Sequence, residues 1–580
     1  MTQYQLIKCP EDFQRMLPAL LNAAVIGVDT ETTGLDPHSA SLRLIQLAIP
    51  GYPVLILDCL ELDPEMNPLL ERVFASSAVK VFQNAKFDIQ FLMTINISVL
   101  LPIFDTMLSA QLLRSSGGPD RVALDVLARH YLGVTLTKEE QASDWSGHLS
   151  ESQLKYAARD AQILLELRDK MVPILVEEDL IEVARLEFAC VRGIAQMEYA
   201  GIYLDRSCWQ RLRLVIESNR QAALEKIYQF TGRPAAQQTL WGDSEPIQIN
   251  PDSSQQVMAW LREQGILVEN TSKHTLSAYA ANPLVAAILE YRQAAKGLSS
   301  FLNPFADMIH AKTARLHPRY SQMGAWSGRM SCGQPNIQQI PREAAYRACF
   351  QAPPGRKLVI ADYSQIELRV AAELAQDQRM IAAYQNHEDL HKLTASLMTG
   401  TPSHQVTPAQ RQAAKAVNFG LIYAMGARGL MEYARETYGI HMTLGEASLF
   451  RNRFFEAYTG IDQWHRRMKA HLPKETRTLA GRKHVYNETA GLASVCNTPV
   501  QGGAADILKQ AIGQLVDTLV SLDAYMVAVV HDEIILEVSE NDAEAAARIL
   551  KQVMEDAGRR YLKHVPTVAE VHIGQHWGEK

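Results

Sequence analysis

Two acidic residues, Asp362 and Asp532, stand where apolar runs of the chain end. Asp532 lies within three residues, 531–533, that separate two such runs, and so short a connection predicts a tight β-hairpin. A buried carboxylate costs free energy unless a cation or hydrogen-bond donors meet it. Mg²⁺ is held by one or two carboxylates together with phosphates and water, and paired ions catalyse phosphoryl displacement. The two acids therefore indicate a two-metal site. An N-cap of the following helix is the alternative for Asp362.

A second group of acids lies in the first third of the chain. Asp29 and Glu31 end an apolar strand and, two residues apart, point to the same face. Asp88 follows another strand-to-helix junction, and Asp160 lies four residues after Tyr156, on the same face of a predicted helix. A metal site is one interpretation. A solvated strand edge and a decorated helix surface are the alternatives.

Four residues at a spacing of four form a stripe on the predicted helix 410–423. The stripe carries two cations and then two aromatic rings, in the order Arg411, Lys415, Phe419, Tyr423. Each step of four drifts by only about 40° around a helix. Cations suit phosphates and ring faces suit a sugar and a base, so the stripe indicates a nucleoside triphosphate site. An amphipathic surface helix is the alternative.

The segment 327–341 is polar and rich in turn residues. Its Arg329, Asn336 and Gln338 side chains suit the minor groove of DNA, where readout is nearly blind to sequence. A plain surface loop is the alternative. Basic residues spread along 273–312 fit either a phosphate-contacting arm or a solvated surface.

The totals describe a multidomain globular protein. A chain of 580 residues is too long for a single hydrophobic core, so we expect more than one domain. The net charge of −7 argues against a simple basic protein that coats DNA. The seven cysteines are scattered and never spaced as CxxC, so neither a disulfide framework nor a zinc site is indicated. We find no signal peptide and no apolar run of about 20 residues, and expect an intracellular protein, cytoplasmic or organellar.

Strands and helices alternate in the N-terminal part, which predicts an α/β domain. A long helix at 181–201 marks the change of domain. Further on, helices are expected at 205–228 and 252–309, with a loop at 231–250 between them.

The acids of the N-terminal part carry a first resemblance. The motifs Asp29-x-Glu31, Asn84-x-x-x-Asp88 and Tyr156-x-x-x-Asp160 resemble the DEDD-type 3′→5′ exonucleases that have tyrosine in the third motif. The resemblance implies two metals bound by the four acids, with Tyr156 positioning the attacking water. An aromatic near Asp88 could stack on an unpaired base, but we expect Phe87 itself to be part of the core.

The later motifs resemble the bacterial DNA polymerase I family, or family A. The palm motifs are Asp362-Tyr-Ser-Gln-Ile-Glu-Leu-Arg369 and His531-Asp532-Glu533, and the stripe at 411–423 resembles the fingers helix. The sequence Asn497-Thr-Pro-Val-Gln501 resembles the start of a helix that contacts the template.

The family resemblance implies a role for each matching residue. Asp362, Asp532 and the backbone carbonyl of Tyr363 would hold the polymerase metals, with Glu533 beside them. Lys415 would protonate the leaving pyrophosphate, and Glu367 would exclude a ribose 2′-hydroxyl. Nucleotide contacts are expected from Arg411, Lys415, Phe419, Tyr423, His391 and Glu367. DNA contacts are expected from Arg329, Asn336, Gln338, Asn497, Gln501 and His531.

The implied fold is α/β and α+β multidomain, with an RNase H-like exonuclease domain at 1–180 followed by a right-hand polymerase at 181–580. The thumb is expected at about 205–315, the fingers at about 376–494, and the palm at about 316–375 and 495–580. We expect a monomeric DNA polymerase with proofreading that uses primer–template DNA, dNTPs and two Mg²⁺ per site, with Mn²⁺ as a substitute.

The chain departs from the family pattern at Ala493, where arginine is common, and at Ala424, where glycine is usual. We expect no 5′-nuclease region before Asp29. Two alternative functions remain: an exonuclease whose weakly active polymerase half holds duplex, and a non-catalytic scaffold.

Overall fold

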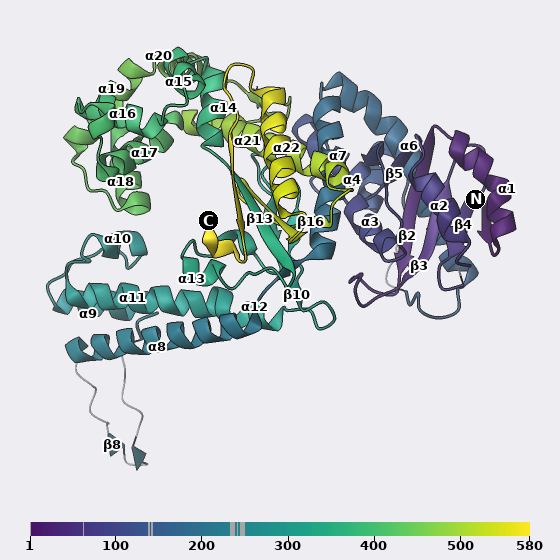
Figure 1. The fold of residues 1–580 in the computed structure, drawn as a ribbon, viewed down its shortest axis with the longest axis horizontal. Coiled ribbons are helices and arrows are strands. Elements are labelled where there is room, and N and C mark those ends of the chain that lie inside the picture. Colours follow the sequence, from purple (N-terminus) through teal and green to yellow (C-terminus); the bar gives the residue numbers. More distant parts are fainter. Residues whose placement is uncertain are drawn as a thin grey trace. The chain divides into compact units, whose positions relative to one another are not determined.

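The structure is a computed structural model that describes residues 2–61, 63–136, 140, 143–231, 238–239, 242–243 and 250–580 (Figure 1). The chain forms two compact units. The first comprises Met1–Gly201, His317–Gln338 and Pro354–Gly574. The second comprises Ile202–Leu316, Gln339–Pro353 and Gln575–Lys580.

A six-stranded sheet organises the N-terminal part of the first unit. Its order is β1-β4-β3-β2-β5-β6, with β3 antiparallel to both neighbours and the other pairs parallel. The interior strands are largely apolar and buried, as expected of strands covered on both faces. The strands are β1 (Tyr4–Ile7), β2 (Val25–Thr32), β3 (Leu42–Ala48), β4 (Val54–Asp58), β5 (Val79–Phe82) and β6 (Ile103–Asp105).

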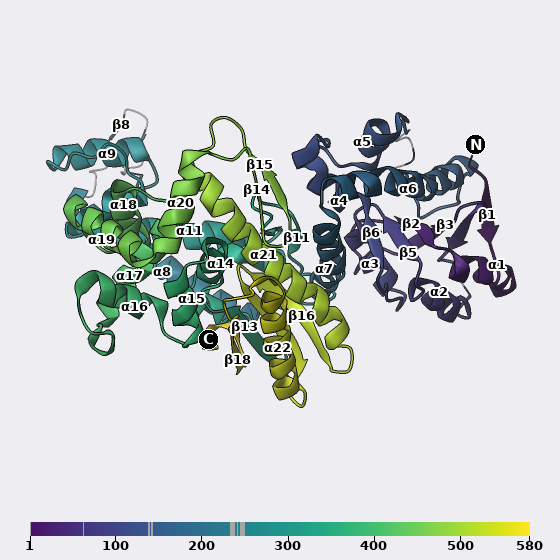
Figure 2. The ribbon, with the colours of Figure 1, turned by 90° about the horizontal axis from the view of Figure 1, so that it is seen from above.

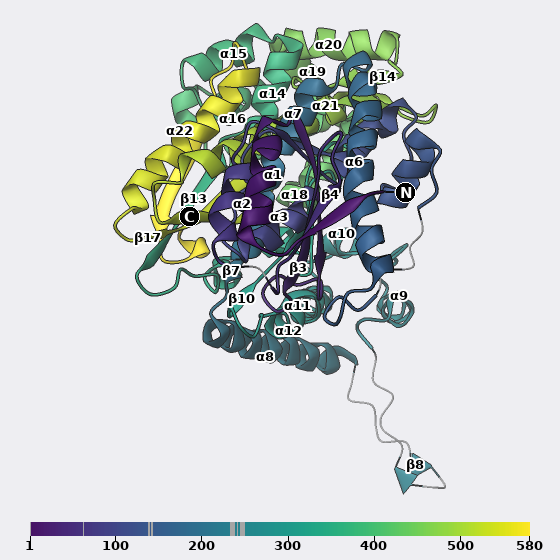
Figure 3. The ribbon, with the colours of Figure 1, turned by 90° about the vertical axis from the view of Figure 1, so that its right-hand side faces the viewer.

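Helices cover both faces of this sheet, which confirms the predicted α/β pattern. Figures 2 and 3 show α6 on one face and α1, α2 and α3 on the other. The Ser150 hydroxyl and the Gln153 amide form a capping box that starts α6. The helices are α1 (Pro10–Asn22), α2 (Met66–Phe74), α3 (Ala85–Met93), α4 (Thr106–Leu113), α5 (Leu124–Leu127), α6 (Glu151–Glu177) and α7 (Ile181–Ala200).

A second, four-stranded sheet lies in the C-terminal part of the same unit. It is antiparallel in the order β16-β17-β13-β18. The helix α22 packs against β13 and β18, while α21 packs against α22 and α7. These elements are β13 (Arg356–Tyr363), β16 (Ala524–Val530), β17 (Glu533–Ser539), β18 (Ala569–Gly574), α21 (Leu492–Thr518) and α22 (Ala543–Tyr561).

A run of helices follows β13 in the chain and ends in a small hairpin. The helices are α14 (Ile366–Ala375), α15 (Gln378–Gln385), α16 (Leu390–Thr399), α17 (Pro408–Ile422), α18 (Ala427–Tyr438), α19 (Leu444–Ala457) and α20 (Thr459–Ala470). The hairpin pairs β14 (Glu475–Arg477) with β15 (Lys483–Val485), and a similar pair precedes β13, β11 (Arg319–Ser321) with β12 (Ser331–Gly333).

The second unit is mainly helical, as expected for 205–228 and 252–309. It contains an aromatic cluster around the buried Trp209, whose ring lies 5.8 Å from those of Phe305 and Phe350. Most of the predicted loop 231–250 lies outside the described residues, although two short strands, β8 (Gln238–Thr239) and β9 (Gly242–Asp243), pair within it. The other elements are β7 (Ile202–Tyr203), α8 (Arg206–Thr231), α9 (Ser254–Glu263), α10 (Lys273–Ser277), α11 (Pro283–Gly297), α12 (Asn303–Asp307), β10 (Arg315–Leu316) and α13 (Ala344–Arg347).

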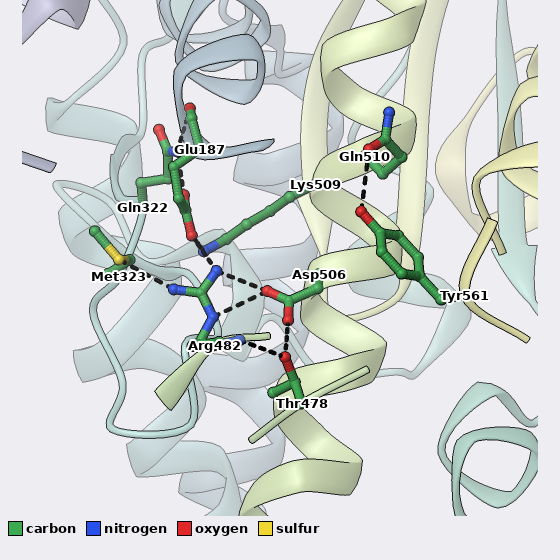
Figure 4. Close-up of polar contacts among 9 residues, drawn as sticks. All are labelled: Glu187, Gln322, Met323, Thr478, Arg482, Asp506, Lys509, Gln510 and Tyr561. Atoms are coloured by element: carbon green, nitrogen blue, oxygen red, sulfur yellow. Dashed lines mark hydrogen bonds and ion pairs between the residues drawn. The ribbon is translucent and has the colours of Figure 1, made fainter. Parts of the chain in front are cut away.

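A buried ionic network joins α7, the β14–β15 hairpin and α21 (Figure 4). Lys509 Nζ lies 2.6 Å from Glu187 Oε1, and Arg482 contacts Glu187 and lies 2.6 Å from Asp506 Oδ1. All four side chains are buried. Burial opposes the charge on Glu187, but the two cations hold its pKa below the ordinary value. Two acids and two bases therefore balance within the core and tie three elements together.

We predict that Glu187→Gln destabilises the full chain strongly. The substitution leaves Lys509 and Arg482 buried with one carboxylate in place of two, and breaking a buried ion pair costs about 3–5 kcal/mol. Urea unfolding, followed by circular dichroism, should show a lower midpoint.

The matched control is Glu182→Gln, on the same helix, because the side chain of Glu182 is 58% exposed. Its effect should stay within about 0.5 kcal/mol. Equal midpoints for the two variants would contradict a structural role for the network.

Candidate functional site

Four carboxylates and a tyrosine face one cavity of about 400 Å³ in the N-terminal part. Asp29 and Glu31 come from β2, Asp88 from α3, and Tyr156 and Asp160 from α6. The structure thus brings together all five residues that the sequence motifs single out.

Close packing of α6 on β2 produces this convergence. A Cβ atom at Gly27 would lie only 2.4 Å from the carbonyl oxygen of Ala161, so a larger residue there would displace the helix. The hydroxyl of Thr30, between the two acids of β2, donates to Asp88 Oδ1 over 2.6 Å. The strand β2 therefore fixes both α6 and the start of α3.

Burial raises the pKa of every acid in this group, and repulsion within the group adds to the effect at Asp29 and Glu31. Burial, with repulsion from Asp160 and Asp88, raises the pKa of Glu31 to about 9. Burial raises the pKa of Asp88 to about 8 and that of Asp160 to about 6. Burial, followed by repulsion from Glu31, raises the pKa of Asp29.

This donor set fits divalent cations, which prefer carboxylate oxygens and would offset both penalties. Within the described ranges, no three Asp, Glu, His or Cys side chains have the spacing of a preformed ion site. Because Mg²⁺ needs only one or two protein carboxylates besides phosphate and water, an open acidic cavity is compatible with such ions.

Asp105, which the sequence analysis did not single out, organises one wall of this region. Its buried carboxylate accepts hydrogen bonds from the backbone N–H groups of Ala85 at 2.7 Å and Leu108 at 3.0 Å. It therefore holds the first turns of α3 and α4 together, and α3 carries Asp88. The sequence signal was an acid directly between a strand and a helix, as at Asp362.

Two aromatic residues border the cavity. The hydroxyl of Tyr156 is hydrogen-bonded to Asp160, and burial with the nearby carboxylates raises its pKa, so it stays protonated. Phe87 lines the cavity and is only partly buried. As expected, Phe87 packs against the core of the N-terminal part, and because α3 starts at the cavity edge the same side chain also borders the cavity.

The second group of acids meets at one end of the four-stranded sheet. The Tyr363 N–H donates to the Asp532 carbonyl oxygen over 3.3 Å. Asp362 pairs in register with Glu533. The structure therefore places Asp362 and Asp532 at the same end of neighbouring strands, β13 and the β16–β17 hairpin.

The hairpin turn is tighter than predicted. His531, at φ 60°, and Asp532 form a two-residue turn, while Glu533 pairs with Val530 and belongs to β17. The sequence had suggested a three-residue tip. Glu533 is 4% exposed, since the ladder continues to the edge of the turn.

Asp362 also pairs with Glu570 of β18 on its other side. Directly paired residues of antiparallel strands point to the same face, so Glu533, Asp362 and Glu570 form a row of three carboxylates across the sheet. Like charges so placed repel, which again favours a cation at this edge. Glu570 was not recognised from the sequence, because its pairing depends on register.

Glu367 joins the helix after β13 to two other segments. Its carboxylate accepts a hydrogen bond from the Tyr423 hydroxyl and forms an ion pair with Arg329. Tyr423 is also hydrogen-bonded to Gln501 of α21. Four residues predicted to line the nucleotide and DNA sites therefore contact one another.

Three residues of the predicted stripe lie on α17, and the fourth, Tyr423, is the residue that caps its C-terminal end. Arg411, Lys415 and Phe419 are half-buried, whereas the opposite side of the helix is buried. Arg411 Nε donates to Asp389 Oδ2 over 2.7 Å. Asp389 also caps α16 by accepting from the backbone N–H groups of His391 and Lys392, so it fixes α16 and α17 together.

His391 is a neutral hydrogen-bonding group in this structure. Burial lowers its pKa to about 4. Its Nδ1 lies 2.9 Å from Asn418 Nδ2, and because an amide NH₂ can only donate, Nδ1 accepts and Nε2 carries the proton. Asn418, on the buried side of α17, was not recognised from the sequence.

The polar segment 327–341 is partly regular. Asn336 Oδ1 accepts from the Gln338 N–H over 3.1 Å and so caps a short 3₁₀ turn, Ile337–Gln339. Asn497 and Gln501 lie within α21, which starts at Leu492. The expectation that the helix begins at Asn497 was wrong, because Pro499 is tolerated in its interior.

Ala424 ends the stripe helix in a strained conformation. Its φ is 59°, the left-handed region that an L-residue enters at a cost of about 1–2 kcal/mol. Its N–H donates to the Leu421 carbonyl and the Met425 N–H to the Gly420 carbonyl, the pattern of a Schellman motif. The other departure, Ala493, is exposed in the first turn of α21.

Among the helices that the structure describes, none is long and apolar enough to cross a membrane.

Comparison with known proteins agrees with both groups of residues. Residues 223–579 match the sequence model of "DNA polymerase family A", and residues 4–176 match that of "3′-5′ exonuclease". Both are metal-dependent classes of domain.

Several relatives are DNA polymerases I. The enzyme of Aquifex aeolicus is 33% identical over 99% of both chains. The enzyme of Pseudomonas aeruginosa is 30% identical over 99% of this chain and 66% of its own length. The thermostable enzyme of Thermus aquaticus is 33% identical over 76% of this chain and 53% of its own. The chain thus spans about half to two thirds of the last two relatives.

The fold also matches that of a solved structure, with a TM-score of 0.82 and 25% sequence identity over 99% of each chain. It is the POL domain of Pol1 from M. smegmatis in complex with DNA primer-template and dNTP. Together with the full-length identity to the Aquifex relative, this shows that the chain belongs to the family A DNA polymerases and carries a 3′–5′ exonuclease domain.

Proposed function

We propose that the chain extends a DNA primer with dNTPs at the end of β13 and removes nucleotides from a primer 3′ end in the N-terminal cavity. The observation that carries the proposal is the meeting of Asp362 and Asp532 on neighbouring strands, with the Tyr363 N–H bound to the Asp532 carbonyl.

Asp362, Asp532 and the Tyr363 carbonyl would hold two Mg²⁺, beside Glu533. Bound there, the ions would lower the pKa of the primer 3′-hydroxyl and neutralise the departing pyrophosphate. The strands themselves act by holding the two aspartates at fixed positions, which limits the reorganisation needed when substrate binds.

The residues of α17 would bind the triphosphate. Lys415 and Arg411 would supply positive charge to the phosphates, and Lys415 would protonate the leaving group. Arg411 first exchanges its contact with Asp389 for phosphate. Phe419 and Tyr423 would stack against the base and sugar.

Glu367 would exclude ribonucleotides. Held by Tyr423 and Arg329, its carboxylate has little freedom to move away from a 2′-hydroxyl. The minor groove and the primer end would be contacted by Arg329, Asn336, Gln338, Asn497, Gln501 and His531. Among these, Asn497 has a buried Oδ1 with no hydrogen-bond partner in the described structure.

In the exonuclease cavity, Asp29, Glu31, Asp88 and Asp160 would hold two Mg²⁺, which would activate the attacking water. Tyr156, protonated and bound to Asp160, would orient that water by a hydrogen bond.

The proposed domain bounds are 1–180 for the exonuclease and 181–580 for the polymerase. Within the latter we assign the thumb to about 205–315, the palm to about 316–375 and 495–580, and the fingers to about 376–494. The proposed partners are primer–template DNA and dNTPs, bound by a monomer.

We predict that the two activities separate by substitution. With Mg²⁺, Asp532→Ala should lower primer extension by about 10³-fold or more and keep degradation, because only one metal site is lost. Asp29→Ala should do the reverse. Labelled primer–template on a denaturing gel measures both.

Asp523→Ala, an exposed acid just before β16, is the control and should keep both activities. Loss of both activities in either test variant would contradict two independent sites. Absence of extension by the unaltered protein would favour an exonuclease that merely holds duplex.

We predict that Glu367→Ala raises ribonucleotide incorporation by about tenfold or more, because removal of the carboxylate leaves room for a 2′-hydroxyl. Single-nucleotide extension with matched dNTP and rNTP gives the ratio of kcat/KM. The control is Glu388→Ala, which replaces an exposed glutamate between α15 and α16 and should leave the ratio unchanged. An unchanged ratio in Glu367→Ala would refute the assignment.

We predict that His391→Gln raises the KM for dNTP by about 10- to 100-fold, the worth of a hydrogen bond to a charged group. Since the pKa of His391 is lowered to about 4, the imidazole is already neutral throughout pH 6–8. The ratio of variant to parent KM should therefore be constant over that range. A ratio that grows steadily below pH 6.5 would instead show a charged imidazole at work.

A further inference from the structure

Two cysteines of the second unit lie in contact although 141 residues separate them in the chain. The thiol of Cys349 donates to Cys208 Sγ over 2.9 Å. Both are free cysteines, Cys349 buried and Cys208 partly exposed. A covalent S–S bond is about 2.05 Å long, so less than 1 Å of movement would bring the two sulfurs to bonding distance.

Backbone contacts on both sides hold the two residues in place. Leu204 and Phe350 form an antiparallel bridge, and the Asp205 N–H donates to the Cys349 carbonyl oxygen over 2.9 Å. The Asp205 carboxylate then accepts from the Cys208 N–H over 2.8 Å at the start of α8. The proximity of the thiols thus follows from the pairing of two chain segments and does not depend on one side-chain rotamer.

The aromatic core reinforces this pairing. Trp209, next to Cys208, packs against Phe350, next to Cys349, with ring centroids 5.8 Å apart. The ring of Trp577 also packs against Phe350, with centroids 5.5 Å apart. Both cysteines are therefore anchored by a neighbouring large side chain in the same core.

We propose that Cys208 and Cys349 are a redox modification site, which a peroxide converts to a disulfide and a dithiol reductant restores. The Cys208 thiolate attacks hydrogen peroxide, the O–O bond breaks, and a sulfenic acid and hydroxide form. Cys349 Sγ then attacks the Cys208 sulfur, the S–O bond breaks, and the thiol proton leaves with hydroxide as water. In total two thiols and one peroxide give one disulfide and two waters.

The difference in exposure assigns the order of the two steps. Cys208 is the more exposed of the two residues and so the one that we expect peroxide to reach first, whereas Cys349 is buried. Burial also raises the pKa of the Cys349 thiol, so it remains protonated until the sulfenic acid forms beside it. An accessible cysteine next to a resolving cysteine is the usual arrangement of a reversible thiol sensor.

The disulfide would close a loop that contains most of α8 and the helices α9 to α13. Cross-linking a long loop restricts the unfolded chain and stabilises the folded one. In a reducing compartment such bonds are transient, so the site would respond to oxidative conditions and not act as a permanent staple.

The test uses the reduced full chain treated with hydrogen peroxide and then alkylated. The number of free thiols titrated after denaturation should fall from seven to five. Peptide mapping should find residues 208 and 349 in one linked peptide, non-reducing electrophoresis should show a faster monomer, and dithiothreitol should reverse both changes. The oxidised chain should also unfold several degrees higher than the reduced one.

Cys208→Ser should abolish the loss of thiols and the thermal shift. If the serine variant is poorly folded, Cys208→Ala serves as a second variant, because a partly exposed position should tolerate a small side chain. The matched control is Cys59→Ser, another partly exposed cysteine, which should keep the linked peptide. Linked peptides between two chains, a linked pair other than 208 and 349, or oxidation of Cys208 to sulfinic acid without a link would each overturn the proposal.

Discussion

The rest of the structure depends on holding like-charged carboxylates close together where strands end. Desolvation and repulsion oppose such placement, and the raised pKa values of Asp29, Glu31 and Asp88 record that cost. A flexible loop would let the acids separate. Rigid strands, with α6 packed against the bare backbone at Gly27, keep them in place, so the energy of sheet packing supports the site.

Buried charge serves two opposite purposes in the first unit. In the network of Glu187, Arg482, Asp506 and Lys509, opposite charges compensate one another fully within the core. That network joins α7, which follows the exonuclease domain, to α21, which carries Asn497 and Gln501. At the ends of β2 and β13 the acids cluster with one another, and under the proposed function bound Mg²⁺ would supply the compensation.

Around α17 the polar groups satisfy one another before any nucleotide is present. Arg411 contacts Asp389, His391 contacts Asn418, and Glu367 contacts Tyr423. These contacts limit the freedom of the side chains, and under the proposed function phosphates would replace some of them. The strained Ala424 at the end of the helix adds a local conformational cost at the point where α17 meets the following segment.

Most of the secondary structure and many of the candidate site residues could be predicted from the sequence alone. The alternation of strands and helices, the acids at strand ends and the stripe of α17 depend on neighbours along the chain, and local periodicity reveals them. The tertiary structure alone decided which distant residues meet. Strand register and packing bring together residues that no local pattern relates. Examples are Asp105 between α3 and α4, Glu570 opposite Asp362, the charges around Glu187, and the thiols of Cys208 and Cys349.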